Sequence, residues 1–495
     1  MLPVVPEQAL GELGRTEGSP ETLGLLVRDQ HTRRLLLLRA VLDAAEAADP
    51  AVCPVEAKVR LREDWALLEE ADRGARPGRP WSSAYPGAGA EGAVAAGGST
   101  LSPVRTCLLH PLVGPWARQC LRGLAAGNGP RAQRDTREPS QDLAHFSALA
   151  AVAAARAGLS YAVRLRARDG ALTLPSLGTL RTAVPGDTAV DVVHRRQSLT
   201  LRQPGETDVV VRLQSGFGAW SDAAAWTPAH ALPGLLPGSD PVPLDDLDPY
   251  RTARGAPGHH TLSGPVTLDD AERKRWLHSW SGVASALRLG GEYRVTEAEA
   301  LLRCLVPLSA PPGSIPGGRT TGSCSGTRRE AFGAVLSSTP PSPTTFAATL
   351  VHELQHTKLA ALSDMLTLHH AGPQARYFAP WRPDPRPYDG LLQGAYSHLA
   401  LADFFQRRAL VGTHPADRDS AWAQHARYRE QVGAVLPALV GSGDLTGQGR
   451  RFVDQMVVVY ERMAEHPAPR GQAARAAAYV RAARALWTQR HAPAE

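Results

Sequence analysis

Two histidines and a glutamate are the residues whose types and spacing most clearly indicate chemistry in this chain. His352, Glu353 and His356 form an HExxH motif. Residues four positions apart lie on one face of a helix, so two imidazoles at this spacing can bind one metal ion, with the intervening glutamate near its open coordination site. The motif predicts a metal centre, and the alternative is a helix whose two histidines are only structural.

The residues around the motif predict the helix that such a metal centre needs. Ser342 followed by Pro343 is a typical N-cap and first-turn pair. Apolar residues then recur at helical intervals, at Phe346, Leu350, Leu354 and Leu359. If this helix continued to residue 370, His369 would lie about 20 Å along the axis from His356, too far away to share an ion.

Two histidines do not complete a protein ligand set, so a third ligand must come from elsewhere. A metzincin has a histidine six residues after its HExxH motif, but that position here is Leu362. A gluzincin has a glutamate on a following helix, yet no glutamate occurs between Glu353 and Glu430. The remaining candidates are downstream carboxylates and histidines, namely Asp364, His369, His370, Asp384, Asp389, His398 and Asp403.

Among these candidates we favour His398 as the third ligand. It lies in residues 390–408, which predict a second helix that is apolar nearly all round and therefore buried. A buried histidine is usually a structural core residue, but one beside an incomplete metal site is a good candidate ligand. If His398 is not the ligand, Asp403 or Asp364 is the next choice.

A proline-rich segment, residues 377–387, connects the two predicted helices and carries Arg382 and Arg386. Its prolines exclude regular secondary structure and stiffen the chain, so both arginines should be held in place. Guanidinium groups bind carboxylates bidentately. The two arginines could therefore pair with Asp384 or Asp389, or bind the carboxylate of a co-substrate or an acidic group of the substrate.

Composition excludes several classes of protein. The 495 residues are 43% hydrophobic and 21% charged, which is typical of a globular chain with two or three domains. The net charge is +6, but the arginines are scattered, so we expect no nucleic-acid partner. The five cysteines form no CxxC pair, which predicts neither a disulfide framework nor a thiolate zinc site. No signal peptide and no apolar stretch of about 20 residues is present, so we expect a cytoplasmic protein without a membrane span.

Hydrophobic patterns predict an α+β fold that is mainly helical. Residues 1–158 predict a helical region with a flexible Gly-, Pro- and Ala-rich loop at 76–100. Residues 159–265 predict a β-rich region with an antiparallel sheet and a hairpin turn at Asp169-Gly170. Residues 266–495 predict a helical region that holds the metal site. In the middle region, the carboxylates of Asp245, Asp246 and Asp248 could bind a cation or a peptide amine, cap a turn, or pair with arginines.

Three stretches of the chain carry a resemblance to a known family, namely LVHELQHTKLAAL, YFAPWRPDPRP and GLLQGAYSHLALADFF. With weaker similarity along most of the chain, they resemble the HEXXH-motif peptide-modification family of actinobacterial gene clusters for ribosomally made peptides. The resemblance implies an iron(II)- and 2-oxoglutarate-dependent oxygenase of natural-product biosynthesis. Its expected reaction is β-hydroxylation of a side chain, such as Asp or His, in a precursor peptide. The implied fold is not the double-stranded β-helix usual for such oxygenases.

The resemblance also assigns roles to residues of this sequence. His352 and His356 match the metal histidines, while His398 is our own inference for the third ligand. Arg382 and Arg386 match the proline-rich arginine segment and are candidates for binding the co-substrate carboxylate. Related domains occur alone or fused to radical S-adenosylmethionine enzymes. This chain has no CxxxCxxC signature, so we expect a stand-alone member, with such an enzyme of the same gene cluster as a candidate partner.

Two other functions remain open. In a zinc metalloprotease that cleaves a precursor peptide, the metal would polarise the peptide carbonyl and Glu353 would act as general base. In the oxygenase, Glu353 would instead support the metal ligands or orient the substrate. The third possibility is a non-catalytic peptide-binding protein with a structural metal ion. The missing acidic ligand and the expected cytoplasmic location favour the oxygenase over the protease.

Overall fold

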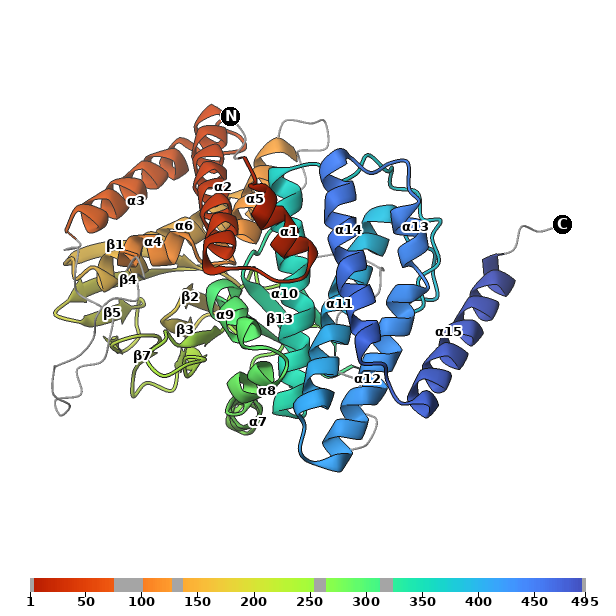
Figure 1. Ribbon diagram of the computed structural model, residues 1–495. Helices are drawn as coiled ribbons and strands as arrows, with labels where there is room; N and C mark the ends of the chain where they lie inside the picture. Colours follow the sequence, from red (N-terminus) through yellow and green to blue (C-terminus); the bar gives the residue numbers. More distant parts are fainter. Residues whose placement is uncertain (1–3, 75–100, 127–136, 253–263, 312–323, 492–495) are drawn as a thin grey trace. The chain divides into compact units, whose positions relative to one another are not determined.

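The computed structural model describes residues 4–74, 101–126, 137–252, 264–311 and 324–491 (Figure 1). These residues form a mainly helical α+β structure with antiparallel sheets of a few strands, which confirms the predicted fold class. The loop predicted at 76–100 lies outside the described residues. The chain packs into two compact units, each described here by itself. The sheet unit comprises His31–Leu268 and Arg303–Ser309, and the HExxH unit comprises Met1–Gln30, Asp269–Leu302 and Ala310–Glu495.

The sheet unit begins with helices and continues into strands. Its helices are the second part of α2 (Pro20–Ala47), α3 (Val55–Gly74), α4 (Pro103–Leu108), α5 (Val113–Ala126) and α6 (Arg137–Arg156). Their shared core contains Trp116, whose ring stacks on Phe146 with centroids 5.8 Å apart. The Trp116 indole donates to the Asp142 carbonyl oxygen at 2.6 Å, so the buried polar atom of this side chain is satisfied.

The strands of this unit form three groups. The order β1-β4-β5-β6-β7 makes a five-stranded antiparallel sheet, and β2-β3-β8 makes a three-stranded one. In the third group β10 pairs antiparallel with β9 and parallel with β11. The bounds are β1 (Tyr161–Ala167), β2 (Ala171–Leu174), β3 (Gly178–Arg181), β4 (Thr188–Arg195), β5 (Ser198–Arg202), β6 (Val209–Leu213), β7 (Ala219–Trp220), β8 (Trp226–Pro228), β9 (His230–Leu232), β10 (Val242–Leu244) and β11 (Cys304–Leu308).

The predicted turn at Asp169-Gly170 is present, but the two strands that flank it do not pair with each other as a hairpin. Both residues have positive φ, 51° and 79°, as a type I′ turn requires. Only the bridge between Arg168 and Ala171 extends the pairing, because β1 then joins β4 while β2 joins β3. The turn therefore sends the chain from one sheet into another.

Small side chains let α6 pack closely on the sheets. Ala148, Ala151, Val152 and Ala155 share one buried cluster with inward-facing strand residues such as Val190. The strands alternate buried and accessible positions, so one sheet face is covered by the helix. The alanine-rich sequence of α6 is therefore what allows this close packing.

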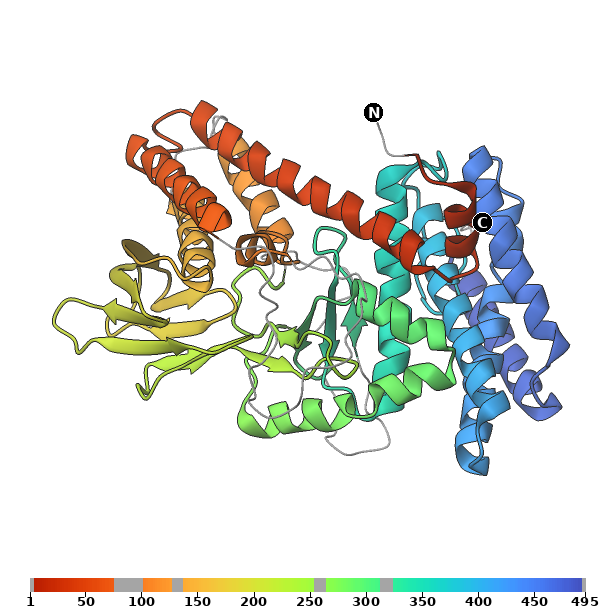
Figure 2. The same ribbon diagram turned by 60° about the vertical axis from the view of Figure 1, so that its left-hand side comes forward.

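The HExxH unit is almost entirely helical. It contains α1 (Glu7–Gly14), the start of α2, α7 (Asp270–Trp280), α8 (Val283–Leu289), α9 (Glu292–Leu301), β12 (Ser325–Gly326), β13 (Ala334–Ser338), α10 (Pro343–Met365), α11 (Tyr388–Val411), α12 (Pro415–Gly433), α13 (Leu436–Val440), α14 (Gly447–Arg462), a 3-10 turn (Met463–Glu465) and α15 (Arg470–His491). Figures 1 and 2 both show α10, α11 and α12 running side by side. The long helices α10 and α11 are buried over most of their surfaces, as their sequences predict.

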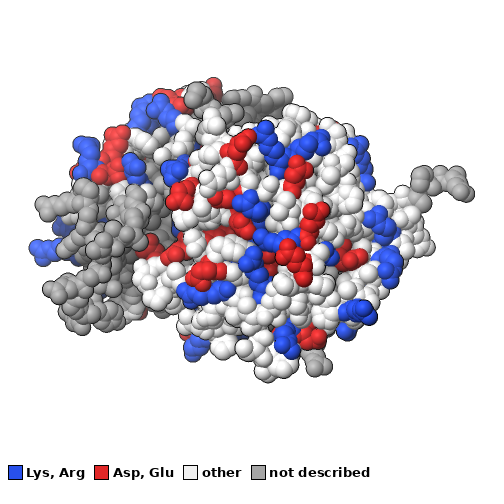
Figure 3. Space-filling model, in the orientation of Figure 1, with Lys and Arg blue, Asp and Glu red and all other residues white. Residues whose placement is uncertain are grey.

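Charge is distributed evenly over the visible surface of this unit. Figure 3 shows basic and acidic side chains interspersed on the face formed by the HExxH unit. Among the exposed ion pairs of this unit, Arg451 and Glu7 lie 2.5 Å apart. Among the described helices, none combines the length and the apolar character that crossing a membrane requires.

Candidate metal centre

Helix α10 places the two motif histidines. Its start is as predicted, because the Ser342 hydroxyl accepts a hydrogen bond from the Thr345 amide at 3.2 Å and Pro343 occupies the first turn. The helix ends at Met365, and Leu366 is already extended, with φ −148° and ψ 156°. The continuation to residue 370 is therefore not formed.

His369 consequently lies outside α10 and has other contacts. Its Nε2 is 3.6 Å from the Asp389 carboxylate, and its ring packs against Tyr388 with centroids 4.8 Å apart. Its backbone forms a bridge with Leu445. These contacts hold His369 beside the start of α11, so the straight-helix argument about its distance from His356 no longer applies.

The two motif histidines face each other at a distance suited to one metal ion. His352 Nε2 and His356 Nε2 are 3.1 Å apart, and the rings are nearly perpendicular, at 77°. Zinc and similar ions bind imidazole nitrogen at about 2.1 Å, so two nitrogens on one ion are separated by roughly 3 to 3.5 Å. The pair therefore has the spacing of two ligands on a shared ion.

Gln393 on α11 orients the second of these rings. Its side-chain oxygen lies 3.1 Å from His356 Nδ1. An amide oxygen can only accept, so Nδ1 carries the proton and Nε2 keeps a free lone pair toward His352. Metal-binding histidines are commonly held in this way by a partner on the other ring nitrogen. The sequence alone did not single out Gln393, because nothing local marks a glutamine on an apolar helix as a partner of a residue 37 positions earlier.

His398 lies next to the pair, as proposed from the sequence. It is 7% exposed, its ring centroid is 5.6 Å from that of His352, and its Nδ1 is buried without a hydrogen-bond partner among the described residues. The ligand nitrogens of the three histidines do not all lie within 4.8 Å of one another. Binding a common ion would thus require His398 to move closer, and its assignment as third ligand stays a prediction.

The carboxylates considered as alternatives are engaged elsewhere. Asp403 accepts from Tyr293 at 2.6 Å and forms ion pairs with Arg407 and Arg462. Asp364 forms an ion pair with Arg329 at 2.5 Å and accepts from Gln30 at 3.0 Å. Neither carboxylate is free to complete the pair, which leaves His398 as the favoured candidate.

Burial keeps the imidazoles of His352 and His398 neutral. Loss of solvation, together with the charges of His356 and His398, lowers the pKa of His352 well below its usual range. Burial, with smaller effects of His356 and Arg427, lowers the pKa of His398 to about 3. Neutral imidazole is the form that binds a metal ion, so His352 and His398 have the protonation state that metal binding needs.

Glu353 is buried and partly satisfied. It is 2% exposed, and the Ser325 hydroxyl of β12 donates to its Oε1 at 2.7 Å. Its Oε2 is buried and has no hydrogen-bond partner within the described residues. Burial raises the pKa of this carboxyl, against the opposing effects of His356 and of hydrogen bonds from Ser325 and Thr327. Ser325 and Thr327 were missed from the sequence, because a two-residue strand has no local signature.

The proline-rich loop lies over the start of α11. It closes on itself where Tyr377 and Arg386 exchange backbone hydrogen bonds of 2.8 and 2.9 Å. The Trp381 ring contacts His398, with centroids 4.5 Å apart, and it covers Gly394, where an added Cβ would lie 2.4 Å from the indole. The absence of a side chain at position 394 is therefore what lets Trp381 reach His398.

The Arg386 side chain lies against α11 one turn before the place that Trp381 covers. A Cβ on Gly390 would lie 2.8 Å from its guanidinium, and Gly390 precedes Gly394 by one helical turn. Arg386 Nε is buried and has no hydrogen-bond partner in the described structure. Burial, and next the charge of Arg382, lowers the pKa of Arg386, while Asp384 and Asp389 act in the opposite direction. A half-buried guanidinium with an unpartnered Nε donor among the described residues therefore lies against the helix that carries Gln393 and His398.

Comparisons with known proteins add no independent evidence. No protein-family model matches the chain, and no curated protein matches it either.

Proposed function

We propose that the chain is an iron(II)- and 2-oxoglutarate-dependent oxygenase that β-hydroxylates a side chain of a ribosomally made precursor peptide. The observation that carries this proposal is the pair of facing imidazole nitrogens, 3.1 Å apart, on helix α10. This helix packs against α11, and the half-buried guanidinium of Arg386 lies against α11 at Gly390. The first feature suits a metal ion, and the second suits the carboxylate of a co-substrate.

The donor set fits a divalent transition-metal ion. His352 and His356 would hold it, with His398 as the proposed third ligand, and the unpartnered Nδ1 of His398 is a buried polar atom that a ligand role would explain. Bound iron and 2-oxoglutarate would supply dioxygen activation. The reaction converts a C–H bond, dioxygen and 2-oxoglutarate into C–OH, succinate and carbon dioxide.

The residues of the chain would bind and orient the reactants. Arg386 would bind the distal carboxylate of 2-oxoglutarate through its free donor. The rings of Trp381 and Tyr428 both contact the His398 ring, with centroids 4.5 and 5.1 Å away, and would exclude water from it. Glu353, fixed by Ser325, would use its other oxygen to accept a hydrogen bond from the peptide.

The zinc protease is the second candidate, and one observation favours it. The raised pKa of Glu353 and its unpartnered oxygen are suited to a general base. Against it stand the engaged carboxylates Asp364 and Asp403, which leave no acidic ligand for the common protease pattern. The third candidate is a metal-stabilised peptide-binding protein without catalysis. For the chain itself, a radical S-adenosylmethionine enzyme of the same gene cluster remains a proposed partner.

A direct assay separates these functions. The full chain is loaded with Fe(II) without air and mixed with 2-oxoglutarate, oxygen and the precursor peptide encoded beside its gene. The oxygenase adds the mass of one oxygen atom to the peptide and forms one succinate for each product. Zinc-dependent cleavage that needs no 2-oxoglutarate would support the protease, and peptide binding without any turnover would support the binding partner.

Arg386 provides a sharper test of the co-substrate site. Arg386→Met should raise the KM for 2-oxoglutarate more than tenfold, because a charged, buried donor is lost. Arg376→Met is the matched control, since Arg376 lies in the same loop but is exposed and pairs with Asp444. An unchanged KM in Arg386→Met would remove Arg386 from the proposed site.

A further inference from the structure

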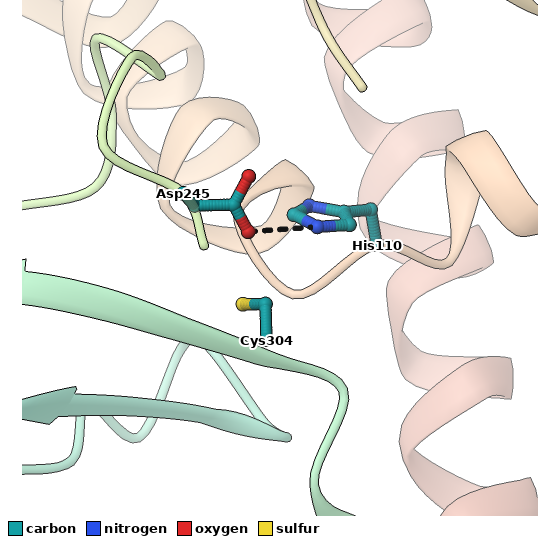
Figure 4. A group of neighbouring side chains, drawn as sticks. All are labelled: His110, Asp245 and Cys304. Atoms are coloured by element: carbon teal, nitrogen blue, oxygen red, sulfur yellow. Dashed lines mark ion pairs between the residues drawn. The ribbon is translucent and has the colours of Figure 1, made fainter. Parts of the chain in front are cut away.

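Three side chains meet in the sheet unit, away from the HExxH motif. His110 lies between α4 and α5, Asp245 directly follows β10, and Cys304 begins β11 (Figure 4). One ligand atom of each lies within 4.8 Å of the other two. Among the described residues, no other three His, Cys, Asp or Glu side chains have ligand atoms this close together.

The parallel pairing of β10 and β11 brings two of these residues together. Leu244 lies opposite Leu305, and the Asp245 amide donates to the Leu305 carbonyl oxygen at 2.8 Å. Successive side chains of a strand point to opposite faces, so Asp245 and Cys304, which flank the leucine pair, share the other face. They are adjacent although 59 positions separate them in the sequence.

His110 completes the group from the connection between α4 and α5. Its carbonyl oxygen accepts from the Val113 amide at 3.1 Å, which fixes the turn into α5. Its Nε2 faces Asp245 Oδ2 at 3.2 Å, as the dashed line in Figure 4 shows. The Leu112 amide lies 3.4 Å from His110 Nδ1, which is at the long end of the hydrogen-bond range. Only this weak hydrogen bond is lost if Nδ1 carries the proton and Nε2 is left free to bind a metal ion.

The cluster contains buried polar atoms that the protein does not fully satisfy. Asp245 Oδ2 is buried, and its 3.2 Å contact with His110 Nε2 does not have the geometry of a hydrogen bond. The Asp245 side chain is 10% exposed. Burial and the Asp245 carboxylate raise the pKa of the Cys304 thiol well above its usual range. The protonated thiol therefore lies beside the carboxylate, and a bound cation would take the place of the thiol proton between the two groups.

We propose that His110 Nε2, Asp245 Oδ2 and Cys304 Sγ form a second metal site, for a divalent transition-metal ion of the zinc class. Mixed sulfur, nitrogen and oxygen donors are typical of zinc, whereas magnesium and calcium require oxygen ligands. The 3.2 Å between the nitrogen and oxygen atoms matches two ligands on one ion, each at about 2.1 Å from the metal.

Charge and access are consistent with this site. On binding, the thiol gives its proton to solvent and a sulfur–metal bond forms, with no electron transferred, so thiolate and carboxylate balance the two positive charges. The Arg34 guanidinium opposes a cation here, but the Asp248 carboxylate acts on the same two residues and offsets it. The His110 side chain is 23% exposed, which leaves a path for water to a fourth coordination position. The bound ion would link the α4–α5 connection to β10 and β11.

Cobalt substitution tests the site, because cobalt bound by a thiolate has an intense charge-transfer band in the near ultraviolet. The purified full chain, stripped of metal by a chelator, is titrated with Co²⁺ alone. Wild type should develop the band, and Cys304→Ser should lose it. Cys120→Ser is the matched control, since Cys120 is an equally buried free cysteine of the same unit and should keep the band. His356→Ala should keep it too, because the HExxH site contains no sulfur ligand.

The test of the second metal site does not depend on whether the HExxH site binds a metal ion. A wild-type chain without the band, or a band that survives in Cys304→Ser, would overturn it. Should Cys304→Ser fail to fold by circular dichroism, His110→Ala replaces it, because the part-exposed His110 can be truncated with less disturbance. His110→Ala should weaken cobalt binding at least tenfold, and unchanged binding would equally overturn the site.

Discussion

Gln393 makes one contact that matters for the metal centre, with the ring nitrogen of His356 that faces away from His352. Gln393→Ala should lower metal affinity at the HExxH site by about 10- to 100-fold, the usual cost of losing such an orienting partner. Gln393→Glu keeps an acceptor at the same position and should retain most of the affinity. Competition with a chromogenic chelator measures both, and equal affinities of wild type and Gln393→Ala would show that His356 needs no orienting partner.

Glu297 is the acidic centre of a buried charge cluster in the HExxH unit. It forms ion pairs with Arg294, at 2.9 Å, and with Lys358 of α10, and all three side chains are at most 2% exposed. Burial lowers the pKa of Lys358 to about 8, against the attraction of Glu297. The cluster also binds the backbone after α1, since Arg294 and Lys358 both donate to the Thr16 carbonyl oxygen.

Removal of Glu297 should therefore be costly. Glu297→Ala removes the ion pair of buried Lys358 and leaves buried Arg294 with its longer 4.0 Å ion pair to Asp403, so it should lower the free energy of unfolding by about 3 to 5 kcal/mol. Glu292→Ala is the control on the same helix, because its ion pair with Arg288 is exposed and should contribute at most about 0.5 kcal/mol. Urea denaturation measures both variants, and similar losses in the two would contradict the importance of burial.

At the level of elements, the cap of α10 links local sequence to the metal site. Ser342→Ala removes the hydrogen bond to the Thr345 amide and should lower the free energy of unfolding by about 1 kcal/mol. Ser363→Ala, inside the same helix, removes no cap and should be nearly neutral, because alanine is the better helix former. Denaturant midpoints compare the two, and an equal response would show that the cap does not stabilise α10.

The junction of α1 and α2 depends on a carboxylate. Glu12 accepts hydrogen bonds from the Ser19 amide at 2.8 Å, the Thr22 hydroxyl at 2.7 Å and the Gln8 amide at 2.8 Å. Burial raises the pKa of Glu12, but these hydrogen bonds outweigh it and lower the pKa from 4.5 to about 2. The ionised form is therefore the one that the folded chain stabilises.

Because the pKa is lowered on folding, the stabilisation by Glu12 is present above pH 4.5 and is lost as the pH falls to about 2. Glu12→Gln should be less stable than wild type by about 2 kcal/mol near neutral pH. The difference should shrink steadily in acid. Glu21→Gln, at an exposed position in α2, is the control and should show little pH-dependent difference. A Glu12→Gln deficit that does not change with pH would contradict this account.

The elements that sequence patterns predicted best are those with local signals. Ser342, Pro343 and the apolar spacing define the start of α10, and the apolar run around His398 defines α11, as the structure confirms. The sequence did not define the end of α10, because no glycine or proline marks Met365, and the chain leaves the helix where Leu368 and His369 meet residues near 445. Contacts distant in sequence decide that boundary.

At the scale of the whole molecule, the sequence could not show which segments pack together. Three consecutive regions were predicted, whereas the HExxH unit combines residues 1–30 and 269–302 with the C-terminal helices. The same limit hid the second cluster. Cysteine spacing predicted no thiolate metal site because it considers nearby cysteines, while Cys304 meets Asp245 through a parallel strand pair and His110 through a turn. Asp245 was noted as a possible cation ligand, but its partners were not.

If both sites bind metal, the two proposals make a joint prediction about the whole chain. All candidate ligands of each site belong to a single unit, so each site should bind its ion independently. Wild type saturated with zinc should hold one ion per site, His356→Ala and Cys304→Ser should each lose one, and the double variant should lose both, as measured by mass spectrometry of metal content.

Stability should follow the same pattern. An ion that binds only the folded state adds about 2.7 kcal/mol when present at a hundredfold excess over its Kd. Zinc should therefore raise the Tm of wild type, and each single variant should lose only the part of that rise due to its own site. The double variant should show no zinc-dependent rise. Loss of metal from the HExxH site in Cys304→Ser would contradict the independence of the two sites.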